Sequence, residues 1–372
     1  MGKKMTCRSK RTALAVLVLL AAIICAELFC RFALGMCDAP LFRGDADYEY
    51  IPQANQDRYR FFCRYRTNAY CQRSEAPDST KKRILGLGDS VLYGGTSMDQ
   101  DSLATTLFSL DTGMQMLNVS AGSWGPDNCA AYLRKHGTFG ASAMVLVCSS
   151  HDAYDVMTFA PVVGVYPTFP DRQYKCGLWE LLDRYLVPKM KFWYYSIAGP
   201  ADAPAVQYAD PDAQVARRAA NRQVLQKGLR FNPGFDELKH IADSCDIPFA
   251  IYLHPETGEL AAGAYNDMGK DIIHWADTAG VHLVEGISTE TADMYRDCIH
   301  LNGKGQRHLA DELKKIIGGF YKFALADFEF IFEDNRRTSE RRAELARAIP
   351  SEEEEGSPNC KVKRERSGLR DQ

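Results

Sequence analysis

Residues 83–95, RILGLGDSVLYGG, join a short apolar run to a bend that carries a serine. The run Arg83–Leu87 is rich in Ile and Leu, which is the pattern of a buried strand. Gly88-Asp89-Ser90 follows at once, and its small residues allow a sharp turn where the strand ends. In open α/β folds such a bend lies at the carboxyl edge of the sheet, where ligands bind. The pattern therefore presents Ser90 as a candidate nucleophile.

A serine hydroxyl is a weak nucleophile until a neighbouring base takes its proton. The sequence supplies a base far downstream, where Asp297 stands three residues before His300. We expect His300 to take the Ser90 proton and to return it to the leaving group. Asp297 would accept a hydrogen bond from the other imidazole nitrogen, which fixes the tautomer. A turn serine and a capped helix entry are the structural alternatives for these residues.

Strand and helix patterns alternate through the main part of the chain, which favours a parallel sheet with helices on both faces. We expect strands at Arg83–Leu87, Gln115–Val119, Ala143–Cys148, Pro248–Leu253 and Val281–Val284. We expect helices at Asp101–Leu110 with Asp101 as a candidate cap, from Pro126 to His136, at Phe235–Ser244, within Ala264–Gly280, and from Lys304 to Leu325. The predicted class is α/β.

Three blocks of the sequence together resemble the SGNH/GDSL hydrolase superfamily, in particular its exported, membrane-anchored bacterial members. Gly88-Asp89-Ser90 and Asp297-x-x-His300 match the outer motifs, and Asn118–Gly122 (NVSAG) matches the second block. The resemblance spans about residues 83 to 324. It implies a flavodoxin-like, three-layer α/β/α fold with about five parallel strands. It also implies a serine esterase with a Ser90-His300-Asp297 triad and no cofactor.

One block departs from the family pattern, which has Gly-x-Asn-Asp after the third strand. This chain has Ser149-Ser150-His151-Asp152 there. The resemblance assigns the oxyanion hole to the backbone N–H groups of Ser90 and Gly122, and His151 stands where a third donor, an asparagine, is expected. A neutral imidazole can donate one hydrogen bond, and its charge can change near neutral pH. Asn128 is the alternative donor, although helix capping also explains it.

Four polar residues are candidates for contact with substrate: Asp89, Asn128, Asp152 and His254. His254 ends the fourth strand, and a hydrogen bond within a loop is its alternative role. His151, Asp152 and Asp155 also have the spacing of metal ligands. However, the mechanism requires no metal, and Asp152 occupies the family's own aspartate position. We therefore predict that no metal is bound.

The amino-terminal residues 1–36 predict an export signal or a membrane anchor. Five basic residues precede the uncharged run Ala13–Ala26, which is the pattern of both: Lys3, Lys4, Arg8, Lys10 and Arg11. An anchor continues through Leu28–Met36 only if Glu27 and Arg31 lie near the outer interface. Cleavage at Ala33-Leu34-Gly35, giving a secreted protein, is the alternative. We favour an uncleaved single-pass anchor with the remainder on the periplasmic or cell-surface side.

The remaining chain divides into three predicted segments. Residues 37–82 form a connector with short strands, and residues 83–328 form the hydrolase domain with an insertion at 154–226. Residues 335–372, rich in Arg, Glu and Ser, predict a disordered charged tail. The formal net charge of -3 in 372 residues excludes a broad basic surface for nucleic acid. Oligomeric state is left open.

The predicted function is hydrolysis of an ester, an acyl (acetyl) group on a carbohydrate or an acylated small molecule. One alternative passes the acyl group to a polysaccharide hydroxyl and makes the protein an O-acyltransferase. Another alternative is a non-catalytic carbohydrate-binding protein on the same scaffold. Aromatic residues of the connector and the insertion either pack structurally or face sugar rings: Tyr59, Phe61, Phe62, Tyr65, Trp179, Tyr185, Trp193, Tyr194 and Tyr195.

Overall fold

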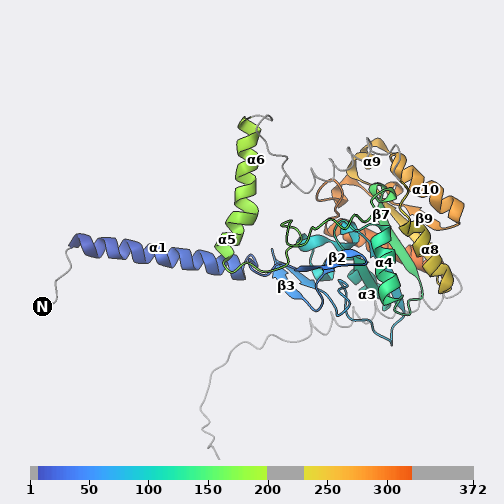
Figure 1. Ribbon diagram of the computed structural model, residues 1–372, viewed down its shortest axis with the longest axis horizontal. Helices are drawn as coiled ribbons and strands as arrows, with labels where there is room; N and C mark the ends of the chain where they lie inside the picture. Colours follow the sequence, from blue (N-terminus) through green and yellow to red (C-terminus); the bar gives the residue numbers. More distant parts are fainter. Residues whose placement is uncertain (1–6, 199–229, 321–372) are drawn as a thin grey trace, which may run out of the picture. The chain divides into compact units, whose positions relative to one another are not determined.

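A computed structural model describes residues 7–198 and 230–320 of the chain (Figure 1). The chain divides into compact units at 1–325 and 326–372, and the second unit lies outside the described residues. The predicted tail at 335–372, the basic residues before position 7, part 199–226 of the predicted insertion and the end of the predicted domain at 321–328 also lie outside them.

A parallel sheet with the strand order β6-β5-β7-β8-β9 forms the centre of the fold. Its strands are β5 Arg83–Gly88, β6 Gln115–Ser120, β7 Met144–Ser149, β8 Phe249–His254 and β9 His282–Glu285. All five strands lie where the sequence predicts them, to within one residue at the start of each. In chain order the arrangement is 2-1-3-4-5, which is the flavodoxin-like order. The predicted α/β class with about five parallel strands is therefore confirmed.

Helices cover the sheet, and their bounds follow the predicted pattern closely. They are α3 Ala104–Thr112, α4 Pro126–His136, α8 Gly234–Ser244, α9 Thr257–Ala262, α10 Asp267–Ala279 and α11 Gly303–Phe320. Short 3-10 turns are η1 Gly95–Ser97, η2 Gln100–Ser102, η3 Ser150–Ala153, η6 Gly286–Ser288 and η7 Ala292–Met294. The predicted cap at Asp101 is wrong. Leu103 precedes α3 in an extended conformation, and the Asp99 carboxylate instead accepts the Asp101 N–H at the start of η2.

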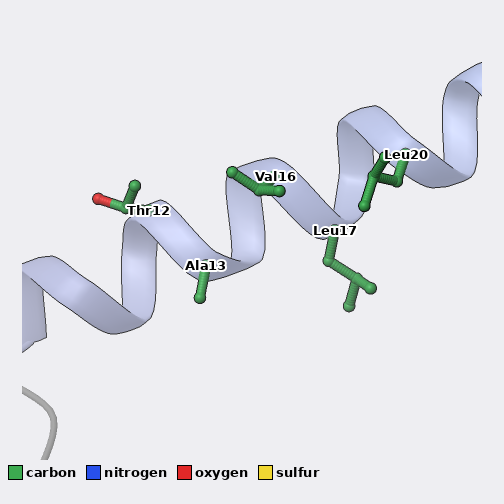
Figure 2. Close-up of a pocket in the computed structure, with 5 residues that line it drawn as sticks. All are labelled: Thr12, Ala13, Val16, Leu17 and Leu20. Carbon is green, nitrogen blue, oxygen red and sulfur yellow. The ribbon is translucent and has the colours of Figure 1, made fainter.

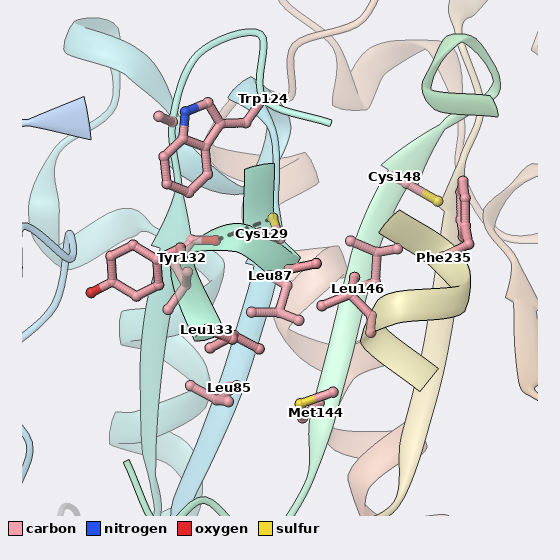
Figure 3. Packing of buried hydrophobic residues seen from close by; sticks show 14 of the residues in the cluster. Leu85, Leu87, Trp124, Cys129, Tyr132, Leu133, Met144, Leu146, Cys148 and Phe235 are labelled. Atoms are coloured by element: carbon pink, nitrogen blue, oxygen red, sulfur yellow. Dashed lines mark hydrogen bonds between the residues drawn. The ribbon is translucent and has the colours of Figure 1, made fainter. Parts of the chain in front are cut away.

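Alternate residues of the strands build the larger core. Side chains that are two positions apart point to the same face of a sheet, and Figure 3 shows Leu85 and Leu87 of β5 beside Leu146 of β7. Tyr132 of α4 and Phe235 of α8 pack on this face and are buried with them. Each fully buried aliphatic or aromatic side chain stabilises the fold by roughly 1.5–3 kcal/mol. On the described α11, the Gln306 amide accepts the Ala104 N–H at 2.8 Å, which links that helix to α3.

The connector forms two antiparallel hairpins ahead of the sheet. They are β1 Phe42–Asp45 with β2 Glu49–Pro52, and β3 Asp57–Arg60 with β4 Cys63–Arg66. Side chains of the connector enter the domain, since the Trp124 indole donates to the Tyr50 carbonyl at 2.8 Å and the Tyr93 hydroxyl donates to the Tyr65 hydroxyl at 2.9 Å. Tyr65 is therefore a packing residue, whereas Phe62 is 69% exposed.

Two helical segments stand outside the α/β layers. Helix α1, Cys7–Phe32, contains the stretch Lys10–Phe32, which by length and composition alone is apolar enough to cross a membrane or to be a signal sequence. Figure 2 shows Val16, Leu17 and Leu20 projecting from α1, and all three are at least half exposed. The predicted insertion contains α5 Gly177–Leu181, a π-helical turn Leu182–Leu186 and α6 Val187–Ala198 in direct succession.

Candidate active site

Ser90 opens the four-residue helix α2, Ser90–Tyr93, directly after strand β5. Gly88 is required at this bend because a Cβ there would lie 2.7 Å from the Val147 carbonyl oxygen on β7. The buried Asp89 carboxylate then accepts the Val91 N–H at 2.8 Å and caps the helix. Strand end, tight bend and cap together present Ser90 at the carboxyl edge of the sheet, partly exposed.

A buried arginine of the connector fixes the far end of α2. Arg73 is 1% exposed, and its guanidinium donates to the backbone carbonyls of Tyr93 at 2.5 Å, Gly95 at 2.5 Å and Met98 at 2.6 Å. Gly94 ends the helix at a φ of 73°, which favours glycine. The Tyr93 carbonyl at the end of α2 has no partner inside so short a helix, and the Arg73 side chain satisfies it together with the Gly95 and Met98 carbonyls of the turn that follows.

The three residues predicted to form a triad lie within hydrogen-bonding distance of one another. His300 Nε2 is 3.0 Å from Ser90 Oγ, and His300 Nδ1 is 2.8 Å from Asp297 Oδ2. A carboxylate only accepts hydrogen bonds, so Nδ1 carries the ring proton and Nε2 accepts the hydroxyl proton. That tautomer is the one in which an imidazole can deprotonate a serine.

Backbone contacts hold the Asp297 carboxylate in place beneath the histidine. Its Oδ1 accepts the N–H groups of Ile299 at 3.0 Å and His300 at 2.6 Å. Burial raises the pKa of Asp297, but hydrogen bonds from the His300 ring and backbone outweigh burial and leave the pKa well below its ordinary value. Asp297 therefore stays ionised through the mildly acidic range, and it can stabilise an imidazolium on His300.

A second buried histidine supports the loop that carries this pair. His254 Nδ1 lies 2.9 Å from Glu290 Oε1, and its Nε2 lies 2.7 Å from the carbonyl oxygen of Ile299, the residue before His300. Both partners are acceptors, so both ring nitrogens donate and His254 is an imidazolium. Hydroxyls of Tyr252 and Tyr295 donate to the same Glu290 carboxylate at 2.7 and 2.5 Å. Burial lowers the pKa of His254, but the Glu290 charge and hydrogen bond raise it above its ordinary value.

Replacing His254 by glutamine is expected to lower kcat by about 10²-fold, because the 297–300 loop loses a support and a misplaced catalytic group costs about that factor. It should also lower the free energy of unfolding by about 3–5 kcal/mol, since Glu290 is left buried without its counter-charge. Because the pKa of His254 is raised on folding, its charge stabilises the folded protein fully at pH values below about 6.5, the pKa in the unfolded chain. This stabilisation is lost as the pH rises through the pKa of His254 in the folded protein. Denaturant unfolding at several pH values should show the difference shrinking as pH increases.

The control for this prediction is His282→Gln, since His282 is an exposed histidine on β9. An exposed substitution should change stability by less than about 0.5 kcal/mol. Wild-type kcat in His254→Gln would contradict a supporting role for the buried histidine.

His151, the predicted third oxyanion donor, lies among three carboxylates. Its Nδ1 is 3.3 Å from Glu256, and its Nε2 is 3.7 Å from Asp152 and 3.9 Å from Asp89. Burial lowers the pKa of His151, but Asp152, Glu256 and Asp89 together raise it to about 10. His151 is therefore an imidazolium at neutral pH rather than the neutral donor that the sequence also allowed. The charge on His151 stabilises the folded protein fully below pH 6.5, and this stabilisation is lost as the pH rises towards 10.

The same cluster carries more negative than positive charge. Burial and the negative charge of Asp89 together raise the pKa of Asp152 to about 7, against the opposing effect of His151. One ligand atom each from Asp89, His151 and Asp152 lies within 4.8 Å of the others, so these three have the spacing of metal ligands. Asp155 is not in that group. An ion pair with His151 accounts for the group, and absence of a metal stays a prediction.

Replacing His151 by leucine is expected to lower kcat by about 10²–10³-fold if its N–H stabilises the oxyanion. His151→Asn should recover part of this loss, because an amide donates a neutral hydrogen bond from the same position. Steady-state hydrolysis of p-nitrophenyl acetate by both variants measures the two effects. A leucine variant with wild-type kcat would remove His151 from the oxyanion hole.

The structure fixes Gly122 through a residue that the sequence did not single out. The Tyr50 hydroxyl donates to the Gly122 carbonyl at 2.8 Å, which orients the peptide after β6. The connector therefore shapes the predicted oxyanion hole, and no local pattern around Tyr50 signals this contact.

Buried positions argue against substrate contact by some predicted residues. His254 is 0% exposed, and Asn128 is 2% exposed. The Asn128 amide accepts the Gly125 N–H and donates to the Tyr48 carbonyl, so helix capping is its role. The substrate-binding predictions for these two side chains are corrected, since the protein itself occupies their polar atoms. Asp89 and Asp152 are also buried, and each accepts a backbone N–H, from Val91 and Ser149 respectively.

Two hollows in the described part of the chain do not include Ser90. One lies along the exposed side chains of α1 (Figure 2). The other has a volume of about 370 Å³ and is lined by residues of 154–159, by Asp127 and Arg134 of α4, and by residues 230–237 at the start of α8. Neither is lined by a member of the triad, and Ser90, His300 and His151 are each partly exposed.

Comparisons with known proteins give low-identity structural likenesses. A scan against protein-family models and a search of the curated proteins match nothing. A member of the lipolytic protein G-D-S-L family from Veillonella parvula DSM 2008 is 9% identical with a TM-score of 0.34, over 63% of this chain and 97% of that chain. The psychrotrophic esterase EstA from Pseudoalteromonas sp. is 12% identical with a TM-score of 0.36, over 65% and 100%.

The carbohydrate acetylesterase Est24 from Sinorhizobium meliloti is 11% identical with a TM-score of 0.33, over 65% of this chain and 100% of that chain. At this level of identity, residue roles rest on the geometry of the chain itself. In this chain those roles rest on the 2-1-3-4-5 parallel sheet, the Gly88-Asp89-Ser90 bend and the Asp297-x-x-His300 pair.

Proposed function

We propose that the protein is a serine esterase. The observation that supports this most directly is the linked series of contacts from Ser90 Oγ to His300 at 3.0 Å and from His300 to Asp297 at 2.8 Å. Ser90 and His300 are 210 positions apart in the sequence. If Ser90 were only a turn residue and Asp297 and His300 only capped a helix, nothing would require the serine, imidazole and carboxylate to be hydrogen-bonded in series. The contacts therefore favour nucleophilic catalysis.

In the proposed reaction Ser90 Oγ bonds to the ester carbonyl carbon while its proton passes to His300 Nε2. The carbonyl electron pair moves to oxygen, where the N–H groups of Ser90 and Gly122 and the His151 imidazolium stabilise the negative charge. The carbon–alkoxide bond then breaks, and the leaving alcohol takes the proton from His300. Water repeats the sequence on the acyl-serine, releases the acid and restores the Ser90 hydroxyl.

The substrate class is part of the proposal and remains the one predicted from the sequence: an acyl group, such as acetyl, on a carbohydrate. An O-acyltransferase would use the same triad and differ only in accepting a polysaccharide hydroxyl in place of water. A non-catalytic binding protein is the less favoured alternative, because binding alone requires no aligned base on Ser90.

The test uses the full chain purified in detergent, a short-chain p-nitrophenyl ester, an acetylated xylan and an active-site fluorophosphonate. An esterase labels with the probe and releases free acetate without an added acceptor. A transferase labels but releases acetate slowly until a glycan acceptor is present. A folded protein that neither labels nor turns over any of these substrates would contradict the proposal.

We also propose that α1 is a retained membrane anchor with the catalytic domain on the extracytoplasmic side. Its last turns are built into the domain, since Glu27 accepts the N–H groups of Gly177 and Leu178, each at 2.8 Å. Cys30 and Met36 are 3% and 2% exposed. Cleavage after Gly35 would remove Glu27, which accepts the first N–H groups of α5. The loss of these contacts on cleavage supports an uncleaved α1.

A further inference from the structure

Helix α5, the π-helical turn and α6 expose a line of large apolar side chains. Their exposed fractions are 57% for Trp179, 44% for Leu182, 41% for Leu186, 67% for Met190 and 67% for Trp193. The residues follow one another at intervals of three or four, which places them along one face of a helix. We call this line the 179–193 stripe. A contiguous group of large apolar side chains that is exposed to solvent marks an interaction site.

The opposite side of the same helix is fixed to the domain by charge. Glu180 is fully buried, and its carboxylate receives Arg60 at 2.7 Å and Arg184 at 2.8 Å. Arg60 also donates to the Tyr185 hydroxyl at 2.6 Å. These contacts fix the rotation of the helix about its axis at residues 180–185, and the large apolar side chains of the 179–193 stripe lie on its exposed side.

This helix begins beside the end of the apolar α1 segment. Glu27 caps the first N–H groups of α5, at Gly177 and Leu178, and Arg31 donates to the Lys175 carbonyl. If α1 spans a bilayer, Glu27 and Arg31 mark its outer boundary. The start of α5 is therefore held at the level where the chain leaves the hydrocarbon.

The composition of the stripe fits that level. Tryptophan and tyrosine are enriched at membrane–water interfaces, and lysines beside apolar faces attract anionic headgroups. The stripe has Trp179 and Trp193 near its two ends, and the exposed Lys189 and Lys191 accompany it. Five charged residues between 180 and 191 exclude a second spanning helix: Glu180, Asp183, Arg184, Lys189 and Lys191.

We propose that the 179–193 stripe lies in the outer interface of the phospholipid bilayer that α1 spans. The inference rests on the retained α1 anchor but not on the esterase chemistry. A second copy of this chain is the other apolar surface that can cover the stripe. It is less favoured because pairing two stripes brings the lysines at 189 and 191 of both copies together.

Tryptophan fluorescence provides a direct test, because α1 contains no tryptophan and the chain has four in all. Trp124 is 1% exposed, and Trp275 is held on α10 by a hydrogen bond to Asp236. The full chain is reconstituted in vesicles of phosphatidylcholine and phosphatidylglycerol, with the acyl chains brominated either near the headgroup or near the methyl end. Headgroup-proximal bromine should lower the emission by up to about one half, and methyl-end bromine should lower it less.

Two variants separate the possible causes of quenching. Trp179→Phe with Trp193→Phe should abolish the bromine effect. Leu186→Glu with Met190→Glu should reduce it several-fold while leaving hydrolysis of a soluble ester unchanged, because neither residue belongs to the active site. Vesicle flotation is measured in parallel, so that failure of the anchor is seen separately.

Flotation without quenching would overturn the inference and leave the anchor intact, as would quenching that persists in the double phenylalanine variant. Failure to float would overturn both. Crosslinking of wild-type chains through the stripe, with no bromine effect, would assign the surface to a second copy and likewise overturn the lipid inference.

Discussion

Ser90→Ala is expected to lower kcat for p-nitrophenyl acetate by at least about 10⁴-fold, with little change in folding. The hydroxyl is the only group of the triad that bonds to substrate, and removing it leaves the oxyanion donors and binding alone. Ser90 Oγ makes its contact with His300 Nε2 at 3.0 Å and is partly exposed, so its loss creates no buried cavity. Initial rates and fluorophosphonate labelling measure the effect.

The matched control is Ser97→Ala, an exposed serine on the adjoining turn η1. It should retain full activity and labelling. Hydrolysis in Ser90→Ala within tenfold of wild type would show that the reaction uses another nucleophile.

Asp297→Asn is expected to lower kcat by about 10⁴-fold with a much smaller change in KM. An asparagine amide that donates to His300 Nδ1 would force the proton onto Nε2, and that nitrogen could no longer accept the Ser90 proton. The carboxylate pKa is lowered in the folded protein. Its stabilising contribution is therefore present above the unfolded pKa and is lost only as pH falls through the depressed value.

The wild-type Asp297 is therefore expected to stay ionised through the mildly acidic range, so its contribution to stability should not be lost there. Unfolding curves of the wild type and of Asp297→Asn over that range measure this contribution, and the difference between the two proteins should persist. Asp293→Asn is the control, because it removes an exposed carboxylate four residues away. An Asp297→Asn enzyme of normal kcat would exclude Asp297 from the mechanism.

Local pattern was sufficient to predict the sheet. Strands β5, β7 and β8 are short, mainly apolar runs that are almost entirely buried, which is the pattern of strands covered on both faces. The edge strand β9 is only partly buried, and its Leu283 and Val284 were enough to indicate it. The serine bend and the Asp297–His300 pair were also visible locally, since both are short motifs. Their 3.0 Å contact follows from the fold, because β5 lies between β6 and β7 and the loop after β9 returns to the carboxyl edge at which β5 ends.

Long-range polar contacts were not predictable in the same way. His254 was read as an edge residue because it ends β8, but its partner Glu290 lies 36 residues later in an irregular loop without periodicity. Tyr50 reaches Gly122 across 72 residues. The charge of His151 could not be predicted, because the three carboxylates around it are brought together only by the fold. Burial and pairing of charges depend on tertiary structure, and sequence spacing does not report them.

The junction between α1 and the domain determines how far the active site can travel. The residues after Phe32 are themselves hydrogen-bonded, Ala33 to Phe29 at 2.9 Å and Met36 to Cys30 at 2.9 Å, and the Phe61 N–H of the β3–β4 turn donates to the Leu34 carbonyl at 3.0 Å. A chain held in this way has none of the reach of a flexible linker, whose span grows with its length. With α1 as the proposed anchor, an active site tethered without slack would have a high effective concentration for substrate in the same membrane and a low one for distant polymer.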